Sequence, residues 1–243
     1  MRKIWKTPAG QSPVLYCDML SQPHLLIAGA TGSGKSVAIN GIIHSALFNS
    51  PAKVEFILID PKRVELCEYK RLPHTLYYAS EPQEMVRALE YAISITETRY
   101  KAMQRQGKRK SDSSDVYIII DELADLMTTN KRQVQPLIQR ICQIGRAARV
   151  HVIAATQCPL ASVIPTPIKV NFDARLGLRT RSAQDSRNIL GYAGLETLPR
   201  YGQGVYMTPD EDTLYNIPMI PDGERQRLID YWTHTKPKIK LFA

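Results

Sequence analysis

Residues 23–36 read PHLLIAGATGSGKS, and this stretch decides the fold class of the chain. Its apolar part, residues 24–28, is typical of a buried strand, and the part from Gly29 to Ser36 fits the pattern G-x-x-x-x-G-K-[ST] before a helical run. Glycines allow a tight turn whose N–H groups point at phosphate oxygens, and the next helix N-terminus adds partial positive charge. The stretch therefore predicts a phosphate-binding loop. A glycine-rich turn without a ligand is the alternative, and it agrees less well with the complete pattern.

The loop pattern gives roles to single residues. We expect Lys35 to contact the terminal phosphates of ATP and to serve in catalysis, and the Ser36 hydroxyl to bind Mg²⁺. ATP and Mg²⁺ are therefore the expected cofactors. The residues expected to surround the nucleotide are Gly29, Ala30, Thr31, Gly32, Ser33, Gly34, Lys35, Ser36 and Val37.

Two carboxylates follow a second apolar run, residues 116–120. We expect Asp121 to hold the hydration shell of Mg²⁺ and Glu122 to polarise the attacking water, which requires a carboxylate within hydrogen-bond reach of the nucleophile. The alternative is that both acids only cap the helix that begins at Leu123, because acids favour helix N-termini.

A third apolar run, residues 150–156, ends in Gln157. In a parallel sheet the carboxyl ends of the strands line the ligand crevice, so the Gln157 amide is a candidate to meet the γ-phosphate and report its loss. The alternative is an ordinary loop residue before Pro159.

Apolar runs alternate with helical patterns along the chain. Residues 54–59 read as a further buried strand, and residues 82–104 place apolar side chains at the spacing of one buried helix face. Strand and helix in alternation, with near-continuous apolar strands, predict an α/β fold with a mostly parallel central sheet and helices on both faces. Beyond the third apolar run we expect strands at 174–178, 204–207 and 214–217, and helices at 182–190 and 224–231.

The composition excludes several classes of protein. The 243 residues are 44% hydrophobic, which is ordinary for a folded domain and unlike disordered or collagen-like chains. The longest apolar runs are far shorter than the ~20 residues of a bilayer span, and no charged leader opens the sequence, so we expect a soluble chain without a membrane segment. Thirty-two Lys and Arg against 23 Asp and Glu give a net charge of +9, which attracts phosphate backbones or acidic surfaces. The four cysteines lack metal-site spacing, so we expect free thiols and a cytoplasmic location.

Six ordered blocks of sequence resemble the motor domain of the FtsK/SpoIIIE family of bacterial double-stranded DNA translocases, over about residues 14–231. The resemblance implies a RecA-like P-loop ATPase that works as a hexameric ring around duplex DNA. It also implies an ATPase domain at residues 23–234, between a lead-in at residues 1–22 and a basic tail at residues 235–243. The blocks are residues 23–36, 59–62, 121–127, 145–148, 151–157 and 185–190.

The resemblance gives Arg146 a catalytic role. It falls where the family has the arginine that reaches across a subunit boundary to the neighbour's ATP, and a guanidinium can neutralise charge on the γ-phosphate oxygens. The alternative is a solvated cation near a helix C-terminus. Arg149 is the second candidate for the same role.

The resemblance also implies a DNA contact. Arg187 falls in the family segment that faces the central channel, but a lysine of that segment aligns with Ala183 here, and Arg179 and Arg181 are candidates to compensate. Such contacts to phosphate would be independent of DNA sequence and sensitive to salt. The alternatives are a solvated basic face and a DNA site on the basic stretch of residues 99–110.

Parts of the family pattern are missing from these 243 residues. They include its membrane-spanning region, the small helical domain before the motor and the winged-helix module after it. The expected function is an ATP-driven translocase on double-stranded DNA. The alternatives are a coupling ATPase that pumps DNA through a conjugation pore, a type VII secretion-like ATPase that moves protein, and a nucleotide-dependent scaffold that binds DNA without moving.

Overall fold

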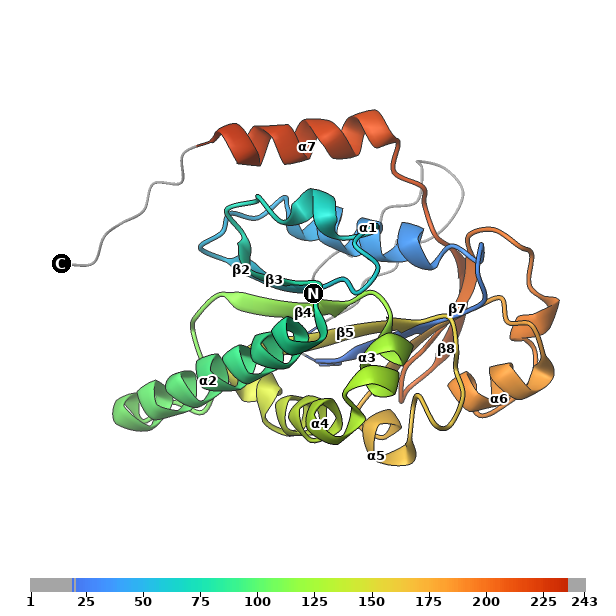
Figure 1. Ribbon diagram of the computed structural model, residues 1–243, viewed down its shortest axis with the longest axis horizontal. Helices are drawn as coiled ribbons and strands as arrows, with labels where there is room; N and C mark the ends of the chain where they lie inside the picture. Colours follow the sequence, from blue (N-terminus) through green and yellow to red (C-terminus); the bar gives the residue numbers. More distant parts are fainter. Residues whose placement is uncertain (1–18, 20, 236–243) are drawn as a thin grey trace.

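An eight-stranded sheet forms the centre of the molecule, with strand order β3-β2-β4-β5-β1-β6-β7-β8 (Figure 1). The computed structural model describes residue 19 and residues 21–235, so the predicted lead-in and basic tail lie almost wholly outside the described residues. Neighbouring strands from β3 to β6 are parallel, and only the β6-β7 and β7-β8 pairs are antiparallel. This confirms the predicted mostly parallel α/β sheet. The strands are β1 (Leu25–Ala28), β2 (Val54–Ile59), β3 (Thr75–Ala79), β4 (Asp115–Ile120), β5 (Val150–Thr156), β6 (Ala174–Leu178), β7 (Gln203–Met207) and β8 (Asp212–Asn216).

Helices cover both faces of the sheet (Figure 1). Side chains alternate across a strand, so Leu25 and Ile27 of β1 join the core under α1 and α7, while Leu26 joins the core under α2 and α4. The inner strands of the parallel part are thereby buried on both sides, as their near-continuous apolar sequences predict. The α-helices are α1 (Lys35–Ala46), α2 (Pro82–Gln106), α3 (Leu123–Thr129), α4 (Lys131–Ala148), α5 (Thr166–Lys169), α6 (Ala183–Leu190) and α7 (Asp222–His234), and the 3-10 helices are η1 (Cys67–Tyr69) and η2 (Leu195–Thr197).

One strand was missing from the sequence prediction. The edge strand β3 reads TLYYA, and all its residues except Ala79 are only half-buried. An edge strand pairs on one side only and needs no continuous apolar run, so its sequence gave no clear strand pattern. Its pairing with β2 extends the parallel part of the sheet by one strand.

The basic stretch of residues 99–110 begins inside the fold. Nη1 of Arg99 donates hydrogen bonds to the backbone oxygens of Ser114 and Ala148, each at 2.8 Å. Gly107 then ends α2 in the left-handed conformation, with φ of 64°. Arg99 therefore ties the start of β4 to the end of α4 and does not belong to a solvated basic face.

Within the described residues, Cys67, Cys142 and Cys158 are free thiols, as predicted. None of the helices in residues 21–235 has the length and apolarity that a bilayer span requires. The same residues contain no cluster of His, Cys, Asp and Glu suited to a metal ion by itself.

Candidate functional site

The predicted phosphate-binding loop lies between β1 and α1. Gly32 and Gly34 have φ of 74° and 102°, in the left-handed region that glycine adopts without strain. The N–H of Ala30 donates to the Arg179 oxygen at 2.8 Å, so the loop is held against the end of β6. Gly34 is the N-cap of α1 and supplies no side-chain cap. The first turn of α1 therefore faces the loop without a side-chain acceptor, as an anion-binding helix end requires.

Close packing explains why Gly29 opens the loop. A Cβ atom at this position would lie 2.6 Å from Cβ of Leu178 and 2.7 Å from Oγ of Ser33. Neither distance leaves room for a methyl group. The loop thus passes so close to β6 that only glycine fits there.

Lys35 and Asp121 meet in a buried ion pair. Nζ of Lys35 lies 2.9 Å from Oδ1 of Asp121 and also donates to the Asp121 backbone oxygen at 2.7 Å. The two side chains are 5% and 2% exposed. The structure therefore joins the two predicted halves of the site, from the loop after β1 and from the end of β4.

The Ser36 hydroxyl has a partner that sequence reasoning missed. It donates a hydrogen bond of 2.7 Å to Oε1 of Glu65, in the loop between β2 and η1. Glu65 follows the predicted block at residues 59–62 by three positions, and that proximity was the only signal for it in the sequence. A third carboxylate therefore stands beside the two residues predicted to hold Mg²⁺.

The Glu122 carboxylate is held by donors from three segments. Its Oε1 accepts hydrogen bonds from Oγ1 of Thr156 at 2.7 Å and from the Gln157 N–H at 3.1 Å. Nζ of Lys62 lies 3.4 Å from Oε2. Glu122 is also the N-cap of α3 and accepts a hydrogen bond from the Ala124 N–H at 3.4 Å. It therefore caps the helix, as the alternative interpretation expected, and contacts the other residues of the site as well. These donors fix the direction of the Glu122 carboxylate.

Gln157 connects Glu122 to the phosphate-binding loop. Its backbone N–H binds Glu122, and its side-chain Oε1 accepts a hydrogen bond of 2.7 Å from Oγ1 of Thr31. A continuous path therefore runs from the end of β4, through the end of β5, to the loop after β1. The position agrees with the predicted contact to a γ-phosphate, which stays a prediction.

A fourth acid, Asp125, lies in the first turn of α3. Burial raises the pKa of Asp125, and the positive charge of Lys62 opposes that rise. The positive charge of Lys62 therefore acts on two carboxylates at the edge of the site, those of Glu122 and Asp125. Sequence reasoning placed Lys62 in a block of the family but gave it no role.

Arg146 is not part of its own subunit's site. It is exposed in the last turn of α4, next to the amino end of β5, whereas Gln157 follows the carboxyl end of that strand. The seven residues of β5 separate the two ends by roughly 20 Å, at about 3.3 Å per residue. Arg146 therefore lies far from the phosphate-binding loop of its own chain.

Arg149, the second candidate for that role, has a structural position. It ends α4 in the left-handed conformation with φ of 59°. Its Nε lies 2.9 Å from Oδ1 of the buried Asp115. Removing Arg149 would leave the Asp115 carboxylate with less compensation for its burial, so the structure does not favour Arg149 as an arginine that reaches a neighbour.

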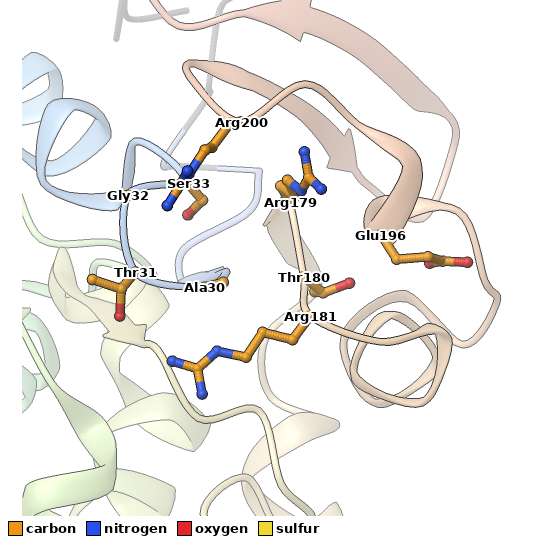
Figure 2. A pocket seen from close by; sticks show the side chains of 9 residues that line it. All are labelled: Ala30, Thr31, Gly32, Ser33, Arg179, Thr180, Arg181, Glu196 and Arg200. Atoms are coloured by element: carbon orange, nitrogen blue, oxygen red, sulfur yellow. The ribbon is translucent and has the colours of Figure 1, made fainter.

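The three predicted DNA contacts are divided between two places. Arg179 and Arg181 line a cavity together with residues 30–33 of the phosphate-binding loop (Figure 2). Arg187 lies outside that lining, on the exposed side of α6. The sequence prediction chose Arg187 from its family position and Arg179 and Arg181 for their charge nearby. Because β6 lies beside β1 in the sheet, only the latter two are brought to the loop.

Comparison with known sequences finds DNA translocases among the relatives of this chain. The model of the FtsK/SpoIIIE family matches residues 7–118 and 112–163. DNA translocase FtsK of Staphylococcus epidermidis is 40% identical over 232 residues, which are 86% of this chain and 29% of the relative. DNA translocase FtsK 1 of Neisseria meningitidis is 34% identical over 250 residues, with 88% and 31% covered. The chain spans less than a third of the length of these curated relatives.

Solved structures show the same fold at lower sequence identity. The pCW3 conjugation coupling protein TcpA superposes with a TM-score of 0.80 and 22% identity, covering 90% of this chain and 68% of that one. The cytoplasmic domain of the type VII secretion ATPase EccC of Thermomonospora curvata gives a TM-score of 0.76 and 22% identity, covering 88% and 28%. The fold is therefore that of P-loop ATPases, and the match of the family model to more than half of the residues shows that the chain belongs to the FtsK/SpoIIIE family.

Proposed function

We propose that this chain is the ATP-hydrolysing motor of a translocase that moves double-stranded DNA. The observation that carries the proposal is the joined site, in which the loop after β1, the acids after β4 and the glutamine after β5 share one hydrogen-bonded arrangement. Such an arrangement suits phosphoryl transfer, where positioning and charge stabilisation do most of the catalysis.

The residues present fit Mg²⁺ together with ATP. The Ser36 hydroxyl and the Asp121 carboxylate offer the hard oxygen ligands that Mg²⁺ prefers, and Glu65 adds a carboxylate within hydrogen-bond distance of Ser36. When bound, the ion neutralises charge on the β- and γ-phosphate oxygens. Ser36 and Asp121 would hold it, and Glu65 would orient the Ser36 hydroxyl.

Lys35 changes partners when the nucleotide binds. In the structure its Nζ group is occupied by two oxygens of Asp121. A phosphate in the loop offers a stronger negative charge, so we infer that Lys35 turns toward it while the Asp121 carboxylate is released for its own role. Exchange of one buried ionic partner for another keeps both groups compensated.

Glu122 accepts the proton of the attacking water. The hydrogen bonds from Thr156 and Gln157 fix the direction of its carboxylate, because both donors are anchored on β5 or directly after it. Gln157 responds to the nucleotide through its contact with Thr31 of the loop. Loss of the γ-phosphate is thereby communicated from the loop to the base.

A complete site requires a second subunit. The exposed position of Arg146, far from its own loop, supports a role at the site of a neighbour, and a ring of subunits supplies such a neighbour at every boundary. We therefore include a hexameric ring in the proposal, with Arg146 acting across each boundary.

Duplex DNA is the proposed substrate because the relatives with 40% and 34% identity are named DNA translocases. The structural likeness to TcpA and EccC, each at 22% identity, concerns the fold alone and does not separate DNA from protein as the substrate. Among the alternatives the higher sequence identity therefore favours a DNA translocase. The cytoplasm remains the predicted location.

The test measures ATP hydrolysis with linear duplex DNA, with single-stranded DNA of equal length, and without DNA. The proposal expects the largest stimulation by duplex DNA, together with a ring-sized mass by light scattering in Mg-ATP. Stimulation by single-stranded DNA alone would instead favour the coupling ATPase. A low rate that DNA does not change would contradict the proposed substrate.

A further inference from the structure

A cavity of about 570 Å³ adjoins the phosphate-binding loop on the side of β6. One wall is the loop itself, residues 30–33, and the opposite wall is residues 179–181, which directly follow β6. Arg200 and Glu196 complete the lining (Figure 2). Sites of this volume take small ligands of nucleotide size.

Three guanidinium groups border this cavity, and none has a partner in the part of the chain that the structure describes. Among residues 21–235, the side chains of Arg179, Arg181 and Arg200 make no hydrogen bond or ion pair. In Figure 2 the Arg200 side chain is directed toward Gly32 and Ser33. The same view shows the Arg181 side chain directed toward the Thr31 side of the loop. Two of the three positive charges, those of Arg181 and Arg200, are therefore directed toward the loop, whereas the Arg179 guanidinium is directed away from it in this view.

The one acid in the lining does not neutralise these arginines. Oε2 of Glu196 accepts a hydrogen bond from the Gly194 N–H at 2.8 Å, and Figure 2 shows its carboxylate directed away from the loop. Backbone hydrogen bonds, and after them the charge of Arg187, lower the pKa of Glu196. Glu196 is thus engaged outside the group of Arg179, Arg181 and Arg200.

A buried hydroxyl in the same lining also lacks a partner. Ser33 is 2% exposed, and its Oγ has no hydrogen-bond partner within the described part of the chain. Buried polar groups are nearly always hydrogen-bonded in folded proteins. This orphaned oxygen is independent of the charge argument and indicates that a polar ligand completes the cavity.

We propose that Arg179, Arg181 and Arg200 bind phosphate groups of the nucleotide held by their own subunit's loop, and not the DNA backbone. The inference rests on the proposed function, because it assumes that the loop binds a nucleotide. Two backbone contacts hold the segments that carry Arg179 and Arg200 against the loop: the Ala30 N–H donates to the Arg179 oxygen at 2.8 Å, and the Gly202 N–H donates to the Ser33 oxygen at 3.4 Å. Guanidinium groups suit phosphate oxygens, since they present several donors in one plane.

Both possible ligands, the nucleotide and the DNA backbone, carry phosphate groups, so the experiment measures the binding of each in a separate arm. The first measures the affinity of a fluorescent ADP with Mg²⁺ for the wild type and for Arg179→Ala, Arg181→Ala and Arg200→Ala. The second measures the affinity of a labelled DNA duplex for the same proteins at several salt concentrations. Arg132→Ala, at an exposed arginine of α4 that is not part of the cavity lining, is the control for the loss of one positive charge.

Each of the three cavity variants should bind fluorescent ADP about 10-fold more weakly, which corresponds to ~1.4 kcal/mol. Competition by pyrophosphate should weaken in parallel, whereas competition by adenosine should not change, because the arginines contact phosphate. The salt dependence of duplex binding should stay as in Arg132→Ala. Lysine at the same positions should restore part of the affinity.

Two outcomes would overturn the inference. One is unchanged affinity for fluorescent ADP in all three variants; the other is a loss of duplex affinity with a flatter salt dependence, which would assign the arginines to DNA. Failure of the proposed function looks different, since the wild type itself would then bind no fluorescent ADP and Lys35→Ala would change nothing.

Discussion

Replacing Glu122 with glutamine removes the proposed proton acceptor while nearly preserving the shape of the side chain. The amide oxygen can still accept from Thr156 and Gln157, which bind Oε1 of the native carboxylate at 2.7 and 3.1 Å. The amide nitrogen would replace Oε2, which lies 3.2 Å from the Gln157 nitrogen and 3.4 Å from Nζ of Lys62. At this one position, the amide N–H groups of the glutamine would then face the N–H of Gln157 and Nζ of Lys62, which are also donors.

The structure therefore predicts a small cost in stability and a large cost in rate. Loss of the contacts at Oε2 should destabilise the fold by about 1 kcal/mol. For a domain of this size that change corresponds to a fall in Tm of ~3 °C. Loss of the base should lower kcat by about 10²- to 10⁴-fold, the usual contribution of general base catalysis. Binding of Mg-ATP should remain, because Lys35, Ser36 and Asp121 are untouched.

Three measurements on one preparation check this prediction: steady-state ATP hydrolysis, fluorescent nucleotide binding and thermal unfolding. Glu97→Gln is the matched control, since Glu97 is exposed on α2 and has no place in the site. Hydrolysis by Glu122→Gln at the wild-type rate would refute the assignment of the base. A Tm fall far larger than predicted would instead show that Glu122 serves the fold more than the reaction.

Three further predictions concern the loop, the subunit boundary and the DNA path. Gly29→Ala should weaken nucleotide binding and lower Tm, because its Cβ would lie 2.6 Å from Cβ of Leu178; unaltered binding would show that the loop tolerates a shift. Arg146→Ala and Glu122→Gln subunits should each be inactive yet regain hydrolysis when mixed, because some boundaries then join an intact Arg146 to an intact Glu122, and co-assembled mixtures without activity would exclude the role of Arg146. Arg187→Ala should reduce the salt slope of duplex binding by about one unit without a change in basal hydrolysis, and an unchanged slope would remove Arg187 from the DNA path.

Local patterns predicted the parts of the site that are contiguous in sequence. The strand, loop and helix around Lys35, and the acids Asp121 and Glu122 after β4, follow from apolar runs and fixed spacing. The proximity of Lys35 to Asp121 could also be predicted, because parallel strands bring their carboxyl ends to one edge of the sheet. The position of Gln157 has the same explanation.

Contacts between segments far apart in the chain could not be predicted from the sequence. Lys62 and Glu122 are 60 residues apart, and Ser36 and Glu65 are 29 apart, so no periodicity or spacing relates them. The prediction for Arg179 treated it as a DNA contact because only its charge was visible. Its place at the loop depends on β6 lying beside β1, and this strand order is a property of the whole sheet.

The central claim is that ATP hydrolysis at this site is coupled to duplex DNA. The most direct test is the ATP hydrolysis rate of the wild-type chain at rising concentrations of linear duplex DNA, with Glu122→Gln as the background. The wild-type rate should rise with duplex DNA and saturate, and the rate of Glu122→Gln should be about 10²- to 10⁴-fold lower at every DNA concentration. A wild-type rate that is the same with and without duplex DNA, in a preparation that binds nucleotide, would contradict it.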